Sequence, residues 1–449
     1  MTDIAGLITC RRKAPYDPGV SVSPPAAPRG RADDGSPASP APAPPGAAPP
    51  VAPAAARPVS LTHARLPLLF SAVGLESTTA VVAPFIAGTL GAAPIALAGI
   101  EAAGRAGGSA ARAGATKLAD RRPGLRGPFT VAGNTGLALA AAFLAGSNAV
   151  WQAGACRSGS WVARGVGTPP LLEVASATGT PSELGARLGL ERSVGALGAA
   201  FGALAAALLL AFVEVRTVIL LALVPVVAAV AVSTHGTLRG RDALDHGVPT
   251  QARPELSLLR QPPLRRLALG IACYEASNIA AVLLLLRASK LLPDGTGRLS
   301  QLQAVAVLYG VFHLSSAAAA VWGGRLADRF GAGRVIATGA AFLLGAYAGF
   351  AFAGEGDLTA MTVCFLLAGT AAGAVDAAEY TGAGRLTPPE THRAVFGALS
   401  GLQSAGRVVA TITAGGLWTL VGPEAGLLVC GPLLVLCVAL FTRGTDRPR

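Results

Sequence analysis

Four acidic residues stand inside long apolar stretches of the sequence, where a carboxyl group could carry a proton or bind a cationic group. Glu76 and Glu275 each lie ten or eleven residues into such a stretch, about 15 Å along a helix and so near its middle. Asp376 and Glu379 are three residues apart and share one helical face. A carboxylic acid removed from water holds its proton more tightly, and two neighbouring carboxylates do not both ionise easily. All four are therefore candidate proton or substrate sites, with Glu76 and Glu275 as the main candidates and Asp376 and Glu379 behind them.

Each of these candidates also has a purely structural interpretation. The first two could be neutral, or could form interhelical ion pairs that only fix the packing. Asp376 and Glu379 could pair with Arg385 or Arg407. His313 is more typical of a helix-contact histidine than of a proton relay.

Basic residues accompany the acids in the same kind of stretch. Arg157 and Arg164 could bind an anionic substrate, or could hold a carboxylate of the first span in its ionised form. Glu101 and Arg105 are four residues apart, a spacing that favours an ion pair within one helix. These four residues join the candidate site because a charge in an apolar helix needs a specific partner.

The composition indicates a chain that lies mainly in lipid. Its 36 basic and 24 acidic residues make up only 13% of the 449, whereas soluble proteins average about 25%. Hydrophobic residues make up 52%, and the mean hydropathy is +0.54. This composition argues against a water-soluble enzyme. The net charge of +12 is better explained by lipid headgroups and membrane orientation than by nucleic acid.

Twelve apolar segments have the length of about 20 residues that a helix needs to cross a bilayer. The sequence thus predicts an all-α membrane protein whose twelve transmembrane helices form two pseudo-symmetric bundles of six. The predicted spans lie near 66–90, 93–116, 128–150, 154–175, 186–212, 216–233, 264–287, 302–323, 334–353, 357–381, 394–419 and 422–442.

Five regions follow along the chain. Residues 1–62 are predicted to be a disordered, Pro/Ala-rich tail, since 14 of the 33 prolines fall within the first 60 residues. Residues 63–233 and 264–443 are the two six-helix bundles, 234–263 a basic linker and 444–449 a short tail. Basic side chains concentrate in the linker and in the turn after the second span, so both tails and the linker are predicted to be cytoplasmic.

Two short sequences recur at a nearly constant offset. Leu118-Ala119-Asp120-Arg121 and Leu326-Ala327-Asp328-Arg329 stand 208 residues apart, each at the end of the second span of its half. Thr180-Pro181-Ser182-Glu183 and Thr387-Pro388-Pro389-Glu390 stand 207 apart, each between the fourth and fifth spans. Two matches in register argue for two homologous halves, the parallel-repeat plan of secondary transporters.

The segment Gly324-x-Leu326-Ala327-Asp328-Arg329-x-Gly331 resembles the signature turn of the major facilitator superfamily. The resemblance covers about residues 64–443. The chain has a closer similarity to a poorly characterised bacterial branch with a glutamate in the first span and an Arg/Lys/Gly-rich fourth span. The segment Arg157-x6-Arg164-Gly165-x4-Pro170 can be laid on that fourth-span pattern. The resemblance implies a cytoplasmic gate in which an aspartate caps a helix N-terminus and ties two helices of one half together. The gate residues are Asp120, Arg121, Gly324, Asp328, Arg329, Gly331 and Arg334.

The resemblance also implies secondary active transport of a small molecule by alternating access. We expect coupling to protons, and export rather than import because many relatives of this general type are exporters. The sequence has no G-x-x-x-x-G-K-[ST] phosphate loop, so ATP is not expected to drive transport, and no cofactor, metal or nucleic-acid partner is expected. The protein is expected to be a multi-pass monomer in the cell membrane, and not an enzyme.

Two alternatives remain open from the sequence alone. The same transporter could be a proton-independent uniporter or an importer. A chain of another class, a transport-like membrane sensor or scaffold, could instead use residues 1–62 to recruit a partner.

Overall fold

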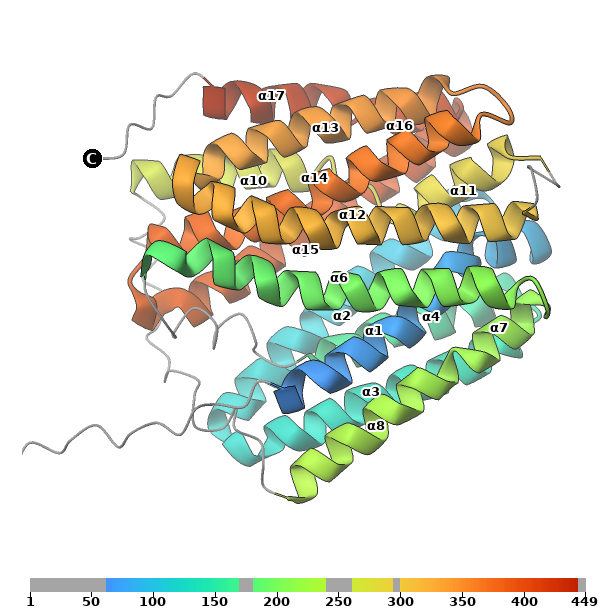
Figure 1. The fold of residues 1–449 in the computed structure, drawn as a ribbon, viewed down its shortest axis with the longest axis horizontal. Helices are drawn as coiled ribbons and strands as arrows, with labels where there is room; N and C mark the ends of the chain where they lie inside the picture. The colour runs from blue at the N-terminus through green and yellow to red at the C-terminus, as the bar shows by residue number, and fades with distance from the viewer. Residues whose placement is uncertain (1–61, 169–180, 240–260, 294–298, 443–449) are drawn as a thin grey trace, which may run out of the picture. The chain divides into compact units, whose positions relative to one another are not determined.

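The computed structural model describes residues 62–168, 181–239, 261–293 and 299–442, and within these ranges every regular element is a helix (Figure 1). Several predicted regions lie wholly or partly outside the described residues. They are almost all of the tail 1–62, the tail 444–449, most of the linker 234–263 and the end of the fourth span. Each of the twelve predicted spans is occupied by one helix, or by two helices in line, which confirms the predicted fold class.

The first half contains six spans. They are α1 (Thr62–Ala83) continued by the π-helical η1 (Pro84–Thr89), α2 (Pro94–Arg121), α3 (Arg126–Ala145), α4 (Val150–Gly167), α6 (Leu184–Leu209), and α7 (Val215–Leu221) followed by α8 (Leu223–Leu238). The second half repeats the pattern with α10 (Pro262–Glu275) and α11 (Ala281–Leu291), α12 (Gln301–Phe330), α13 (Ala332–Phe352), α14 (Leu358–Arg385), α15 (His392–Leu420), and α16 (Pro423–Leu428) with α17 (Gly431–Thr442).

Eight of these spans are long and apolar enough, by composition alone, to cross a membrane within the described part of the chain. The spans that fall short are α2, α4, the pair α10 and α11, and α15. These same helices bring charged side chains into the interior of the bundle, as described below. The helices α10 and α11 fall short by length, with 14 and 11 residues, whereas the charged side chains that α2, α4 and α15 carry inward lower the hydropathy of those three.

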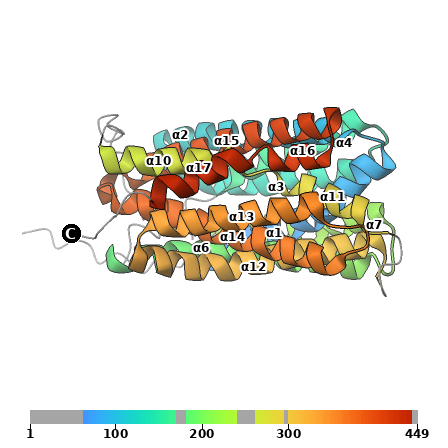
Figure 2. The same ribbon diagram turned by 90° about the horizontal axis from the view of Figure 1, so that it is seen from above.

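The two halves meet along two pairs of helices. In Figure 1, α6 runs beside α12, and in Figure 2, α2 runs beside α15. Small residues allow the close approach of α6 and α12, since a Cβ atom added at Gly189 would meet the backbone carbonyl of Ala320. Along the same pair of helices, a Cβ added at Gly324 would meet the backbone of Gly185.

The seventh span is broken, whereas the sequence predicted one continuous helix over 264–287. Its first helix, α10, ends at Glu275 and α11 begins at Ala281. Residues between them need hydrogen bonds that a helix would otherwise provide. The Tyr347 hydroxyl accepts from the Ile279 N–H at 2.9 Å and donates to the Ser277 carbonyl at 2.9 Å.

A second hydroxyl completes the break. The Oγ1 of Thr411, which is fully buried on α15, accepts from the Ala280 N–H at 3.0 Å. The break is thus stabilised by side chains of α13 and α15, which tie the seventh span to its neighbours. The local sequence alone does not signal it, because the segment 276–280 contains neither proline nor glycine.

Substituting Thr411→Val should destabilise the protein by about 1–3 kcal/mol, because the isosteric change leaves the buried Ala280 N–H without an acceptor. The matched control is Thr362→Val, since the Thr362 hydroxyl bonds only to the Leu358 carbonyl of its own helix. Thermal unfolding of the purified protein in detergent measures both. An equal loss of melting temperature in the two variants would contradict the role assigned to Thr411.

Candidate functional site

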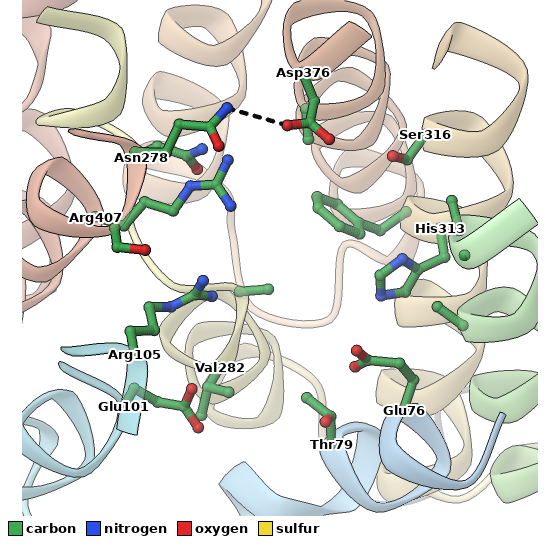
Figure 3. Close-up of a pocket in the computed structure, with 18 of the residues that line it drawn as sticks. Glu76, Thr79, Glu101, Arg105, Asn278, Val282, His313, Ser316, Asp376 and Arg407 are labelled. Atoms are coloured by element: carbon green, nitrogen blue, oxygen red, sulfur yellow. Dashed lines mark hydrogen bonds between the residues drawn. The ribbon is translucent and has the colours of Figure 1, made fainter. Parts of the chain in front are cut away.

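A cavity of about 360 Å³ lies between the two halves, near the middle of the helices that form it. Its walls come from α1, α2, α4 and α6 of the first half and from α11, α12, α13, α14, α15 and residues 278–279 of the second. Figure 3 shows side chains of both halves pointing into this space, among them Glu76, Arg105, His313, Asp376 and Arg407. Of the eight intramembrane candidates from the sequence, six line the cavity, whereas Glu275 and Glu379 lie behind its wall.

Glu101 and Arg157 form the most deeply buried ion pair of the cavity. The Arg157 Nε lies 2.6 Å from Glu101 Oε1, and the two side chains are only 2% and 1% exposed. Trp161 Nε1 donates to the other carboxylate oxygen at 3.1 Å, and Arg157 Nη1 donates to Thr79 Oγ1 at 3.0 Å. The expected pair between Glu101 and Arg105 is therefore wrong, because Glu101 pairs with Arg157 of α4 instead.

Glu76 lies on the cavity wall and bonds to both halves. Arg164 Nη1, from α4 of the same half, donates to Glu76 Oε1 at 3.1 Å. Tyr309, from α12 of the other half, donates its hydroxyl to Oε2 at 2.8 Å. The His313 ring packs edge-on against Tyr309, with ring centroids 4.4 Å apart. The carboxylate is thus a contact between the halves as well as a wall group.

Glu275 is fully buried and lies behind Arg407, not on the wall itself. Arg407 holds it in a bidentate pair, with Nε 2.6 Å from Oε2 and Nη2 2.8 Å from Oε1. Asn278 Nδ2 donates to Oε2 at 3.1 Å. The partner of Glu275 comes from the eleventh span, whereas the partner of Glu76 comes from the fourth. The two glutamates occupy repeat-equivalent spans, yet their partners do not.

Asp376 and Glu379 have different surroundings although they share one helical face of α14. Arg192 Nε, from α6 of the other half, lies 3.0 Å from Asp376 Oδ2. Gln403 Nε2 donates to Glu379 Oε2 at 2.6 Å and to Asp376 Oδ1 at 3.3 Å. Glu379 is fully buried, and its Oε1 has no hydrogen-bond partner in the described residues.

The expected partners of these two acids are engaged elsewhere. Arg407 holds Glu275, and Arg385 Nη2 lies 2.7 Å from Asp328 Oδ1 at one end of the bundle. The interpretation that Asp376 or Glu379 pairs with either arginine is therefore wrong. Asp376 pairs with Arg192 instead, and Gln403 is the close polar partner of Glu379.

Several residues of the site were not predicted from the sequence. Arg192 lies inside the predicted fifth span, so the same argument that singled out Arg157 would have found it. Trp161 gave no such signal, because a tryptophan in an apolar helix is ordinary. In the structure three guanidinium groups surround its ring, those of Arg105, Arg157 and Arg164 at 4.7, 5.4 and 5.7 Å from the ring centroid.

The two motif aspartates lie at one end of the bundle, called here the motif end. Asp328 on α12 accepts from the backbone N–H groups of Gly185 at 2.9 Å and Ala186 at 2.8 Å, in the first turn of α6. A carboxylate at this position satisfies free N–H groups and interacts favourably with the helix dipole. Asp120 on α2 pairs with Arg393 at the start of α15. Each aspartate thus binds the opposite half. Asp328 also pairs with Arg385 of α14, and so ties two helices of its own half as well.

The other motif residues surround these contacts. Gly331 joins α12 to α13 with φ of +89°, a conformation that favours glycine. Gly324 provides the close approach of α12 to α6. The three motif arginines have exposed side chains, those of Arg121, Arg329 and Arg334.

The halves also touch at the far end, opposite the motif end. Between α2 and α15, the Ile95 N–H donates to Thr419 Oγ1 at 3.0 Å, and a Cβ added at Gly415 would meet Ala98. Between α6 and α12, Gln303 Nε2 donates to the Ala207 carbonyl at 3.4 Å. Both helix pairs are therefore in contact at both ends, with the cavity between them.

Known proteins resemble this chain in sequence over part of its length and in fold over most of it. Residues 295–449 match the family model for the Major Facilitator Superfamily. No curated protein sequence matches the chain.

Two solved structures share the fold. The human organic anion transporter MFSD10 (TETRAN) has 15% identity and a TM-score of 0.56, over 85% of this chain and 98% of that one. The Escherichia coli fucose:proton symporter FucP has 16% identity and a TM-score of 0.56, over 86% and 99%. At such low identity the likeness concerns the fold, and it confirms the fold that the signature turn implied.

The charge pairs of the cavity make a thermodynamic prediction. Glu101→Gln should destabilise the protein by about 3–5 kcal/mol, because it leaves the buried Arg157 without a counter-charge. The double variant Glu101→Gln, Arg157→Gln should lose clearly less unfolding free energy than the two single variants lose together.

Thermal unfolding of the purified variants tests this prediction. Glu424→Gln is the control, since Glu424 pairs with Arg287 but is 50% exposed, and its loss should cost about 1 kcal/mol or less. Additive losses at Glu101 and Arg157 would show that their charges do not depend on each other.

Proposed function

We propose that this chain, a membrane transporter of the major facilitator superfamily, moves a small solute by proton-coupled secondary transport. One observation carries the proposal. The cavity between the halves is walled by charged side chains, and two contacts of these side chains join one half to the other. A solute or a proton that changes these contacts changes how strongly the halves are held together.

Alternating access requires the halves to separate at one end while they stay in contact at the other. The motif end is held by Asp120 with Arg393 and by Asp328 on the start of α6. The far end is held by neutral contacts between α2 and α15. In the proposed cycle these two sets of contacts open in turn, which makes the motif residues the gate of the transporter.

Glu379 is the proposed proton carrier. A buried ionised carboxylate is costly unless a cation or several donors compensate it. Glu379 has one close amide donor and a second oxygen without a partner in the described residues, so its neutral form suits this environment. Asp376 lies on the cavity wall and shares the Gln403 amide with Glu379, which makes it the proposed entry for the proton.

Movement of the proton would alter the contact between the halves. Asp376 is ionically paired with Arg192 of the first half, and Arg192 also stacks over the ring of Tyr380, 4.5 Å from its centroid. A proton on Asp376 would remove the negative charge that holds Arg192. The bond that joins α6 to α14 then weakens, which couples proton binding to the opening of the cavity.

The remaining acids have a different proposed role. Glu76, Glu101 and Glu275 each form an ion pair with an arginine, so each of them has a structural partner in this conformation. We therefore assign them to shaping the site, with Glu76 also joining the halves through Tyr309. Proton transfer through Glu76 or Glu275 becomes the secondary hypothesis.

The similar structures support transport but do not choose the solute. One is named as an organic anion transporter and the other as a fucose:proton symporter, so the same fold serves different solutes. The fucose symporter is coupled to protons, which agrees with the proposed proton coupling. Export stays the predicted direction, and the cell membrane the predicted location.

Flux assays in proteoliposomes test the proposal. A panel of radiolabelled solutes is offered with and without an imposed pH gradient, in vesicles that hold the protein in either orientation. We expect at least one solute to accumulate against its gradient only when protons flow. A solute flux that is the same with and without the pH gradient would instead identify a uniporter. Flux in only one orientation of the protein would give the direction of transport.

Glu379→Gln should abolish accumulation driven by a pH gradient, because a neutral amide cannot take or release the proton. Exchange of labelled for unlabelled solute at equal pH should continue, since it needs no net proton movement. The control is Glu355→Gln, a matched change at an exposed turn. Retained proton-driven accumulation in the Glu379 variant would contradict this assignment, while transport itself would stand.

A further inference from the structure

The cavity wall has a surplus of arginine. Six arginines line it but only three carboxylates do. Four of the arginines each pair with a carboxylate. Two of these acids belong to the first half and two to the second. The pairs are Arg157 with Glu101, Arg164 with Glu76, Arg192 with Asp376, and Arg407 with Glu275. Arg112 donates to Thr168 Oγ1 at 3.2 Å.

Arg105 is the exception on this wall. Its Nε is buried without a hydrogen-bond partner, and within the described part of the chain it forms no ion pair. Glu101, one turn away on α2, forms no bond to it in the described residues, and its carboxylate oxygens accept from Arg157 and Trp161 instead. The close neighbour of the Arg105 guanidinium is the Trp161 ring, with the guanidinium carbon 4.7 Å from the centroid. A buried guanidinium that no carboxylate bonds directly can take an anionic partner from the cavity.

A second cation faces the same space. Figure 3 shows Arg105 and Arg407 extending into the cavity from α2 and α15, with Val282 and Asn278 nearby. Arg407 uses Nε and Nη2 for Glu275, and so keeps Nη1 for another acceptor. Two like charges near one another favour an anion between them.

No carboxylate on the wall is left for a cationic solute. Glu76, Glu101 and Asp376 each already pair with an arginine, in the residues that the structure describes. Apolar groups such as Phe312 and Leu343 complete the walls. A volume of about 360 Å³ lies at the small end of the range for small-molecule pockets, roughly 300–1,000 Å³.

From these contacts we infer that the transported solute is a small organic anion whose acidic group is bound by Arg105. The inference rests on the proposed function, since it names the solute class of the same cavity. The carboxylate, sulfonate or phosphate oxygens accept from the Arg105 guanidinium and from Arg407 Nη1. The Trp161 ring holds the Arg105 side chain in place by stacking against its guanidinium group.

Binding to the purified full-length protein tests the inference without any transport. The anionic probes are benzoate, benzenesulfonate, phenyl phosphate, succinate and citrate; benzamide is the neutral isostere of benzoate, and benzyltrimethylammonium is the cation. Thermal stabilisation and tryptophan fluorescence are measured as each probe is titrated. We expect saturable stabilisation by at least one anion and by neither benzamide nor the cation.

Arg105→Gln should weaken the binding of that anion by about 10- to 100-fold, the effect of losing a hydrogen bond to a charged group. Arg105→Lys, which keeps the charge, should recover part of the affinity, and it serves as the test should the glutamine variant fail to fold. The control is Arg325→Gln, since Arg325 also stacks on a tryptophan, 5.4 Å from the Trp322 centroid, but on the exposed side of α12.

Three results would overturn the inference: no saturable stabilisation by any anion, equal binding of benzamide and benzoate, or unchanged anion binding in Arg105→Gln. Its failure is distinct from that of the proposed function. Proton-driven flux of a neutral or cationic solute that survives Arg105→Gln would remove the anion inference and leave transport. Anion binding that depends on Arg105, in a protein without proton-driven flux, would do the reverse.

Discussion

The cost of a charge in a low-dielectric interior is the constraint on which the rest of this structure depends. A buried ion that loses its partner destabilises a protein by several kcal/mol. Four arginines in the middle of the bundle each meet this constraint with an acid from a different helix. Every such pair therefore fixes which two helices lie side by side, and the helices joined in this way are α4 with α2, α4 with α1, α6 with α14, and α15 with α10.

The two ends of the bundle are closed by different physical means. At the motif end, Asp120 with Arg393 and Asp328 on the α6 N-terminus are charged contacts, and separated charges regain favourable interactions once water reaches them. At the far end, Ile95 and Thr419 form a neutral hydrogen bond beside small packed residues. The motif end thus responds to charge and ionic strength, whereas the far end responds mainly to how well the helix surfaces fit.

The sequence predicts the fold far better than the partners inside it. Apolar length finds the spans, and a charge within a span marks its position near the cavity, as for Glu76 and Arg157. Partners escape such reasoning because they depend on how helices rotate and pack. Glu101 is one turn from Arg105 on the same helix, yet its carboxylate accepts hydrogen bonds from Arg157 and Trp161 of α4. The break in the seventh span escapes for the same reason, since the groups that stabilise it lie on α13 and α15.

That break connects the fold directly to the site. Glu275 is the last residue of α10, where the free carbonyls of a helix end already carry partial negative charge. The carboxylate adds to that charge, and the bidentate bond from Arg407 offsets both. Thr411, one turn further along the same α15, accepts from Ala280 across the break. A solute that draws Arg407 toward the cavity therefore acts on the shape of the seventh span itself. Binding and helix rearrangement share one side chain, which is the property that a coupled carrier requires.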